Sequence, residues 1–241
     1  MPVSKVEILG VTVDSLTMTE AVSRVEGFIA NKKPALIATA NAEMIMNATR
    51  DEELKNILNG ADMVVPDGAG TVWAAHQLGC DMPERVAGYD LAQELLRISP
   101  SKGYRVYFFG SAPGVADKAK AKAEELYPGI EICGTRNGYF SEDDENQIVE
   151  DIKTAKPDIL LAALGVPKQE KWLSKYKDVL GVPVNIGVGG TLDVMAGVME
   201  RAPLWMQKAK LEWLFRGLKQ PSRIGRLMAL PRFVFKVLES K

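Results

Sequence analysis

The chain has 241 residues, of which 46% are hydrophobic and 25% charged, so it can bury a sizeable core, and disorder is excluded as its main state. Its 30 basic and 31 acidic residues are unevenly distributed: residues 201–241 carry a net charge of +8, against −9 for residues 1–200. A basic end on an acidic body predicts an anionic partner for the C-terminal part of the chain.

Short apolar runs alternate with helical patterns along the first 200 residues, which predicts an α/β fold with a Rossmann-like parallel or mixed sheet. A hairpin is expected at 6–13 with its turn near Gly10, and a capping box of Thr17 and Glu20 opens a helix that ends near Asn31. Further strands are expected at 35–40, 63–65, 105–109, 131–134, 159–164 and 182–188.

Helices are predicted between these strands, with Asp90 and Ser141 as the caps of two of them. Their expected ranges are 42–49, 52–59, 70–78, 90–98, 114–127, 142–154 and 167–176. Beyond Arg201 only helical patterns remain. We therefore expect two domains, an α/β core at 1–200 and a helical basic appendage at 201–241.

Two glycine-rich loops are candidate anion sites, because glycine lets a ligand approach the backbone and helix N-termini present N–H groups. One contains Gly110 and Ser111, and the other contains Gly187, Gly189 and Gly190. Neither matches G-x-G-x-x-G or the P-loop pattern, so an ordinary strand-to-helix turn remains the alternative for each.

Asp67 directly follows a predicted strand, between Pro66 and Gly68. A carboxylate at the rim of a sheet can accept a proton from a hydroxyl nucleophile, whereas the alternative is a turn aspartate bonded to its own backbone. Thr39 and Asn41 lie at another strand end and are candidates for orienting a substrate hydroxyl. For Asn41 the alternative is a cap of the following helix.

Gln169 and Glu170 open a predicted helix and are candidates for holding a sugar or base edge, with first-turn polarity as the alternative. Arg85 is a candidate diphosphate ligand, with a solvated surface arginine as the alternative. These strand-end loops are expected to converge on the carboxyl edge of the sheet, where α/β folds bind ligands.

No metal site or cofactor is expected. The single histidine, His76, disfavours zinc, and the chain contains no D-x-D pattern of the kind that holds magnesium in many nucleotide-sugar enzymes. The two cysteines, Cys80 and Cys133, lack C-x-x-C spacing and are too few for a disulfide scaffold, which fits a reducing compartment. We expect no secretory signal, and no apolar run approaches the ~20 residues needed to span a bilayer, so any membrane contact is expected at the surface.

The appendage has the pattern of a basic amphipathic helix with Trp205, Trp213 and Phe233, which suits an anionic membrane surface. A helix packed on the core or a subunit interface are the alternatives. Nucleic acid is not expected as a partner, because no nucleic-acid-binding motif accompanies the charge.

Eight segments together resemble the WecG/TagA/CpsF family of bacterial glycosyltransferases, most closely its TagA branch of wall teichoic acid synthesis. They are TANAEM (39–44), PDG (66–68), ERVAGYD (84–90), GYF (138–140), LGVPKQE (164–170), GVGG (187–190), RAP (201–203) and LEWLFR (211–216). Each is weak alone, but their order and number over almost the whole chain make the set specific.

The resemblance implies an inverting, metal-independent transfer of N-acetylmannosamine from its UDP donor to undecaprenyl-diphosphate-N-acetylglucosamine, with a β-1,4 link, at the cytosolic face of the membrane. It implies a glycosyltransferase fold distinct from the two commonest ones and a core that can self-associate. Asp67 matches the general base, and Thr39, Asn41, Gln169 and Arg85 match pocket residues. The appendage residues that match diphosphate ligands are Arg216, Arg223 and Arg226.

Alternatives of other classes remain at this stage. A nicotinamide-dependent Rossmann enzyme would use the same glycine loops, and a non-catalytic membrane adaptor would use the appendage without Asp67. Within the family, a branch that uses the uronic acid form of the donor sugar is a further alternative.

Overall fold

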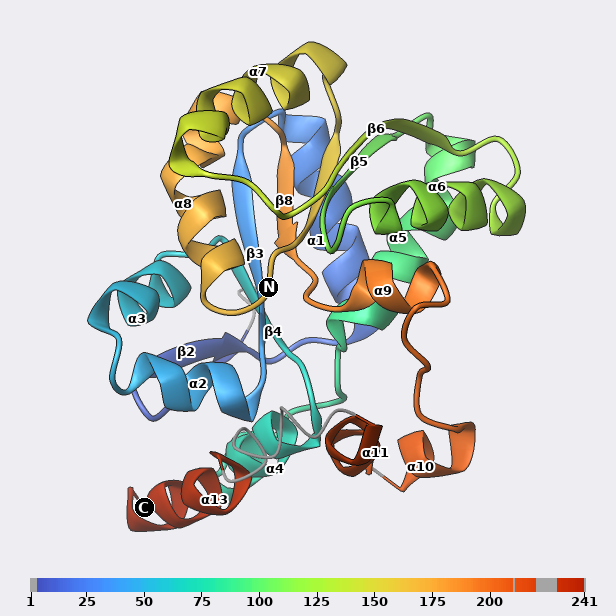
Figure 1. The fold of residues 1–241 in the computed structure, drawn as a ribbon. Helices are drawn as coiled ribbons and strands as arrows, with labels where there is room; N and C mark the ends of the chain where they lie inside the picture. The colour runs from blue at the N-terminus through green and yellow to red at the C-terminus, as the bar shows by residue number, and fades with distance from the viewer. Residues whose placement is uncertain (1–3, 210, 220–228, 241) are drawn as a thin grey trace.

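The computed structural model describes residues 4–209, 211–219 and 229–240 (Figure 1). A six-stranded sheet with all neighbouring strands parallel forms its centre. In spatial order its strands are β4 (Met63–Pro66), β3 (Ala35–Ala40), β8 (Val184–Gly187), β7 (Ile159–Ala163), β5 (Arg105–Gly110) and β6 (Glu131–Arg136). The predicted α/β class with a parallel, Rossmann-like sheet is confirmed.

The predicted hairpin forms a separate two-stranded antiparallel sheet of β1 (Lys5–Ile8) and β2 (Val11–Asp14). Asp14, the last residue of β2, links the hairpin to the main sheet. Asp14 is almost fully buried, and its carboxylate accepts the Val64 N–H at 2.7 Å and pairs with Arg24 at 3.2 Å. The free edge of β4 is thus partly covered, which hinders its pairing with another chain.

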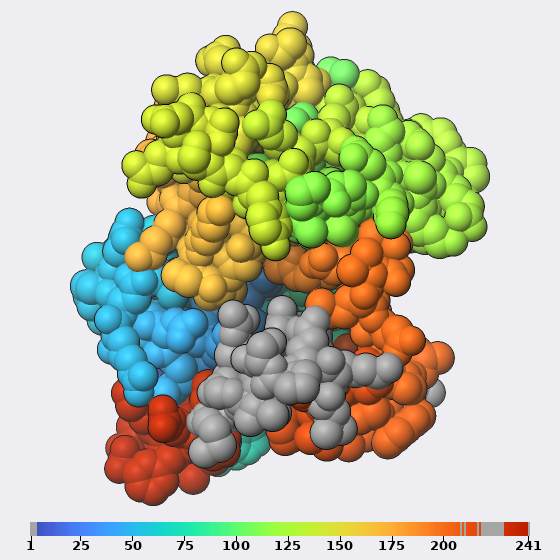
Figure 2. All heavy atoms as spheres, viewed as in Figure 1, coloured from blue at the N-terminus to red at the C-terminus, as the bar shows by residue number. Residues whose placement is uncertain are grey.

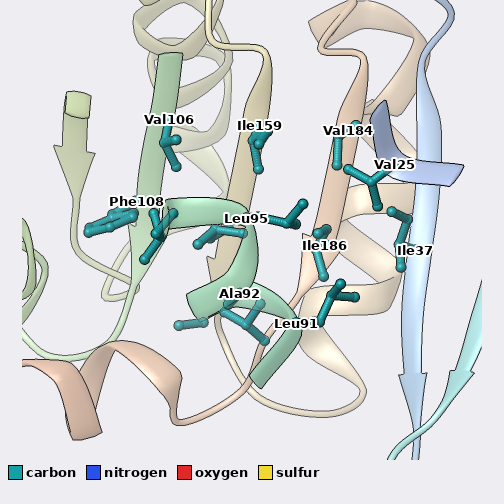
Figure 3. Close-up of a cluster of buried hydrophobic side chains, with 14 of the residues drawn as sticks. Val25, Ile37, Leu91, Ala92, Leu95, Val106, Phe108, Ile159, Val184 and Ile186 are labelled. Carbon is teal, nitrogen blue, oxygen red and sulfur yellow. The ribbon is translucent and has the colours of Figure 1, made fainter. Parts of the chain in front are cut away.

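Helices cover both faces of the sheet, as crossover connections between parallel strands require. One face carries α1 (Met18–Asn31), α5 (Gly88–Lys102), α6 (Val115–Leu126) and α9 (Thr191–Met195). The other carries α2 (Ala42–Ala48), α3 (Glu52–Asn59), α7 (Glu145–Ala155) and α8 (Lys168–Leu180). Figure 3 shows the first face, where Leu91 and Leu95 of α5 point at Ile186 and other strand residues.

Alternation along β5 shows how the two faces are built. Val106 and Phe108 belong to the cluster under α5, whereas Tyr107 and Phe109 belong to the cluster under α7 and α8. Side chains two residues apart on a strand lie on the same face of the sheet, so consecutive buried residues of β5 contribute alternately to the two hydrophobic clusters. This accounts for the continuous apolar strands that the sequence displays.

Most predicted elements agree with the structure to within a few residues, but the helix expected at 90–98 does not. Helix α5 begins at Gly88 with Ala87 as its N-cap, and it continues to Lys102 with Pro100 inside it. The prediction that Asp90 caps the helix is therefore wrong; its carboxylate pairs with arginines instead. Ser141 does form a capping box, but on the short 3-10 helix η1 (Glu142–Asp144) that precedes α7.

Three helices of the C-terminal segment are described: α10 (Leu204–Lys208), α11 (Glu212–Lys219) and α13 (Ala229–Glu239). They lie beyond the end of the sheet at which β3 and β4 finish (Figure 1), and of the three it is α13 that packs against α4 (Ala69–Gln77). Phe233 and Val237 of α13 are fully buried in the cluster that includes α2 and α4. Among the described residues, no helix is both long and apolar enough to cross a bilayer.

Burial of Phe233 corrects one expectation. The sequence pattern assigns Phe233 to a membrane-facing surface, but its side chain has no exposed area. The alternative of a helix packed on the core is therefore correct for the Phe233 and Val237 face of α13. The outer face of the same helix leaves Phe235 and Leu238 exposed.

Candidate active site

Asp67 lies directly beyond β4, at the carboxyl edge of the sheet. Its N–H donates to the Ala40 carbonyl at 3.0 Å, so the end of β4 is tied to the end of β3. The Thr71 hydroxyl, in the first turn of α4, donates to the carbonyls of Ala40 and Asp67 at 3.0 and 3.3 Å. Gly68 has a φ of +94°, which only glycine adopts easily, so the chain can turn from strand to helix immediately after Asp67.

Thr39 and Asn41 stand on the neighbouring strand end. The Thr39 hydroxyl donates to the Gly187 carbonyl at 3.0 Å and thereby links the end of β3 to the end of β8. Asn41 is the N-cap of α2, and its side-chain oxygen accepts the Met44 N–H at 2.9 Å. The cap alternative for Asn41 is confirmed. A substrate role for the rest of its amide stays a prediction.

Gln169 forms a clamp between two loops. Its side-chain oxygen accepts the Gly165 N–H at 3.2 Å and the Gly189 N–H at 3.1 Å, so it joins the loop after β7 to the loop after β8. Its amide nitrogen donates to the Glu170 carboxylate at 2.8 Å. A Cβ at Gly187 would lie 2.5 Å from that nitrogen, so the clamp requires glycine in β8.

Glu170 is a buried acid of this region with a strongly raised pKa. Its side chain is 2% exposed, and its second carboxylate oxygen is buried without a hydrogen-bond partner. Burial raises the pKa of Glu170 to about 7, and the hydrogen bond from Gln169 opposes this only in part. A buried carboxyl in the first turn of α8 (Lys168–Leu180), at the carboxyl edge of the sheet and with such a pKa, is a mark of a functional region.

The second predicted loop assembles at the end of β5. Gly110 adopts a φ of +136°, and a Cβ there would lie 2.3 Å from the Ala163 carbonyl oxygen, so no other residue fits. The Ser111 N–H donates to that carbonyl at 2.9 Å, and its hydroxyl donates to Asp193 at 3.2 Å. Lys168 donates to the Gly138 carbonyl at 3.2 Å and brings a cation to this end of the site.

The glycine loops therefore have fewer free donors than their sequences suggest. The Ser111 N–H is donated to Ala163 and the Gly189 N–H to Gln169. Both loops do form the strand-to-helix turns named as the alternative. The glycines leave the backbone open to close approach, and positive charge near these loops comes from side chains such as Lys168.

Arg85 reaches the same edge from the segment before α5. The Val86 N–H donates to the Pro66 carbonyl at 3.0 Å, which places Arg85 beside the residue that precedes Asp67. Its guanidinium contacts Glu212 of α11 and lies 3.5 Å from the Asp90 carboxylate. Burial alone would lower the pKa of Arg85, but Glu212, Asp67 and Asp90 outweigh it and raise the pKa. The alternative of a solvated surface arginine is wrong.

The structure thus brings Thr39, Asn41, Asp67 and Arg85 to one end of the carboxyl edge, and Gly110 with Ser111 to the other. Gln169 with Gly187, Gly189 and Gly190 lies between them. Figure 2 shows the surface hollowed where the segments of α8 and α9 approach each other. Arg216 lies in α11, whereas Arg223 and Arg226 lie outside the described residues.

Sequence reasoning missed three charged neighbours of this site: Arg201, Glu212 and Asp193. A signal existed for Glu212, because it is one of only two acidic residues after position 200. A rare acid in a strongly basic segment indicates a specific cationic partner. Among the described residues, no group of three or more His, Cys, Asp or Glu side chains is placed to hold a metal ion.

Comparison with known proteins adds independent information. The model of the glycosyl transferase WecG/TagA/CpsF family matches residues 6–241. Similar relatives include proteins of Staphylococcus aureus strains MW2, NCTC 8325 and MRSA252, each named N-acetylglucosaminyldiphosphoundecaprenol N-acetyl-beta-D-mannosaminyltransferase. Each is 35% identical over 240 residues, which cover 99% of this chain and 94% of the relative.

Proposed function

The chain belongs to the WecG/TagA/CpsF family of glycosyl transferases, and we propose that it transfers N-acetylmannosamine from UDP-N-acetylmannosamine to undecaprenyl-diphosphate-N-acetylglucosamine. The full-length similarity to relatives that carry this activity in their name supports the donor and the acceptor class. Membership of a glycosyltransferase family argues against the two alternatives of other classes, a nicotinamide-dependent enzyme and a non-catalytic membrane adaptor. The product belongs to the linkage unit of wall teichoic acid.

The observation that carries the mechanism is the position of Asp67 beyond β4, beside Arg85 and the ends of β3 and β8. Asp67 takes the proton of the acceptor 4-hydroxyl as that oxygen bonds to the anomeric carbon. The bond from this carbon to UDP breaks on the opposite face, and UDP leaves with the electron pair. The transfer inverts the anomeric centre, and general base catalysis of this kind contributes about 10²–10⁴-fold.

The donor is long enough to follow the carboxyl edge. From β4 to β5 the edge crosses four strand spacings, about 20 Å at ~4.8 Å each. With the sugar near Asp67, the diphosphate and nucleoside extend toward Gly189, Gly190 and the Ser111 loop. Negative charge on the leaving UDP needs cationic side chains, because Ser111 and Gly189 already donate their N–H groups within the protein. Arg216, Arg223 and Arg226 of the appendage are the proposed source.

We place the enzyme on the inner face of the cell membrane, as a peripheral protein held by residues 201–241. Leu204, Trp205 and Phe235 are each more than 60% exposed, and Trp213 is 43% exposed. Apolar and aromatic side chains on a segment with a net charge of +8 are the features that bind an anionic bilayer surface. This position brings the site to a lipid-linked acceptor.

Release of UDP from UDP-N-acetylmannosamine, with and without a lipid-linked N-acetylglucosamine acceptor and in the presence of EDTA, tests the proposal. We expect release that depends on the acceptor and persists in EDTA. No release by folded protein with lipid present would reject this donor. The uronic acid form of the donor, assayed in parallel, distinguishes the alternative branch.

Asp67→Asn tests the general base. We expect acceptor-dependent turnover to fall by about 10²-fold or more, because an amide cannot accept the proton, while UDP binding measured by calorimetry changes little. Asp178→Asn, an exposed position on α8, is the matched control and should keep normal turnover. Near-normal turnover of Asp67→Asn would eliminate Asp67 as the base.

A further inference from the structure

Four charged side chains form a closed ring of ion pairs between the core and the C-terminal segment. Arg85 contacts Glu212 and lies 3.5 Å from Asp90. Arg201 lies 2.8 Å from the other Asp90 oxygen and 3.5 Å from Glu212. Charges therefore alternate around the ring, and each arginine contacts both carboxylates.

The ring is partly buried and well supported. Its side chains are between 16% and 35% exposed, so water screens their attraction less than it would on an open surface. The Arg201 guanidinium also stacks on the Tyr89 ring, 4.4 Å from its centroid. A planar guanidinium held by two carboxylates and a ring face has little rotational freedom.

The ring fixes both ends of a strap. Arg201 and Glu212 flank residues 202–211, where Ala202 and Met206 are buried and Leu204 and Trp205 are among the most exposed large apolar side chains. Both anchors of the strap bind the same short stretch of the core, Arg85 to Asp90. Through Glu212 the C-terminal segment thus contacts Arg85, and Arg85 lies near Asp67.

We propose that Glu212 and Arg201 are positioning residues for the transfer reaction, because they close the ring that holds Arg85 beside Asp67. This inference rests on the function proposed above. Both carboxylates contact Arg85, so in this arrangement the guanidinium serves as the fixed neighbour of the base rather than as a diphosphate ligand. Glu212, an acidic residue in a basic segment, thus has a role that attraction to an anionic membrane does not explain.

Glu212→Gln and Arg201→Gln, singly and combined, test the ring. Each single variant is expected to lower kcat on the order of 10²-fold with the KM for the donor within about twofold, because Arg85 loses its fixed position while the donor site stays intact. The double variant should lose little more than either single one, since one broken contact already opens the ring. The melting temperature should fall by no more than a few degrees, because these side chains remain partly exposed, and binding to phosphatidylglycerol vesicles should not fall in proportion to kcat.

Glu94→Gln is the matched control, because Glu94 also pairs with an arginine of α5 but lies on the surface, and its kcat should not change. Normal kcat in both single variants would overturn the proposal, as would losses that multiply in the double variant. A fall in vesicle binding that matches the fall in kcat would also overturn it, since that result shows an anchoring role. If Glu212→Gln does not fold, Arg201→Lys replaces it as the test. This variant keeps the positive charge but loses the planar guanidinium that contacts two carboxylates, and it must show the same loss of kcat. Wild-type protein without transfer activity would reject the proposed function instead.

Discussion

At the scale of single residues, the pair Gln169–Glu170 shows how this site is held together from within. One glutamine side chain joins the loops after β7 and β8, and a buried carboxylate fixes the orientation of its amide. An amide turned the other way would aim its NH₂ group at two N–H donors. Glu170 therefore acts through Gln169, and because it is buried, a change in its charge state should alter the stability of the fold.

Glu170 predicts a pH dependence of stability. Its pKa is about 7 in the folded protein, above its usual value of 4.5, so the folded state holds the proton more tightly and stability falls as pH rises from about 4.5 to 7. At pH values above this range, the free energy of unfolding is lower by a value on the order of 3 kcal/mol than at pH values below it. Glu170→Gln should therefore lose less stability than wild type between pH 5 and pH 8, measured by urea unfolding. Glu124→Gln, on the surface of α6, should follow the wild type; parallel curves for all three proteins would contradict the prediction.

At the scale of elements, α13 divides its apolar residues between two partners. Phe233 and Val237 face α2 and α4, whereas Phe235 and Leu238 face outward. Helical spacing alone shows that two apolar stripes exist, but it does not say which one packs on the protein. The position of α13 on the core decides this: the Phe233 and Val237 stripe packs on the protein, and the Phe235 and Leu238 stripe is exposed.

Phe233→Ala and Phe235→Ala are a matched pair that separates these roles. Phe233→Ala should release α13 from the core, because truncating a buried phenylalanine costs about 3–5 kcal/mol, and amide exchange in residues 229–240 should become fast. Phe235→Ala should leave that exchange slow but weaken binding to anionic vesicles about tenfold or more, through the loss of apolar contact with lipid. Exchanged effects of the two variants would show that the helix faces are assigned wrongly.

Local signals account for what the sequence could predict about these elements. Buried strands such as 35–40 and the capping box at Thr17 are set by neighbours in the chain, and the structure contains both. The strand-end positions of Asp67 and Thr39 followed from the parallel sheet. The ring of Arg85, Asp90, Arg201 and Glu212 joins positions more than 100 residues apart, and no local pattern reports such a contact. Asp90 was misassigned as a cap for this reason.

At the scale of the whole molecule, the described part of the C-terminal segment covers part of the core through α13. Leu230 and Phe233 reach Gly70 of α4, where a Cβ would meet them at 3.6 and 3.8 Å. The surface beneath α13 is therefore apolar and closely fitted. A boundary at residue 200 stays a prediction, but the contacts imply that the first 200 residues alone would expose a surface that the intact chain buries.

A chain that ends at residue 200 should therefore self-associate, because exposed apolar patches of this kind drive protein contacts. Sedimentation velocity should show a mass that increases with concentration for the truncated chain and a constant mass for the full chain. A synthetic peptide of residues 229–241 should return the truncated protein to a monomer, whereas the same peptide with Phe233→Ala should not. A truncated chain that stays monomeric at all concentrations would mean that the covered surface has no role in assembly. Because the ring is absent from the truncated chain, added peptide should restore the monomer without restoring transfer activity.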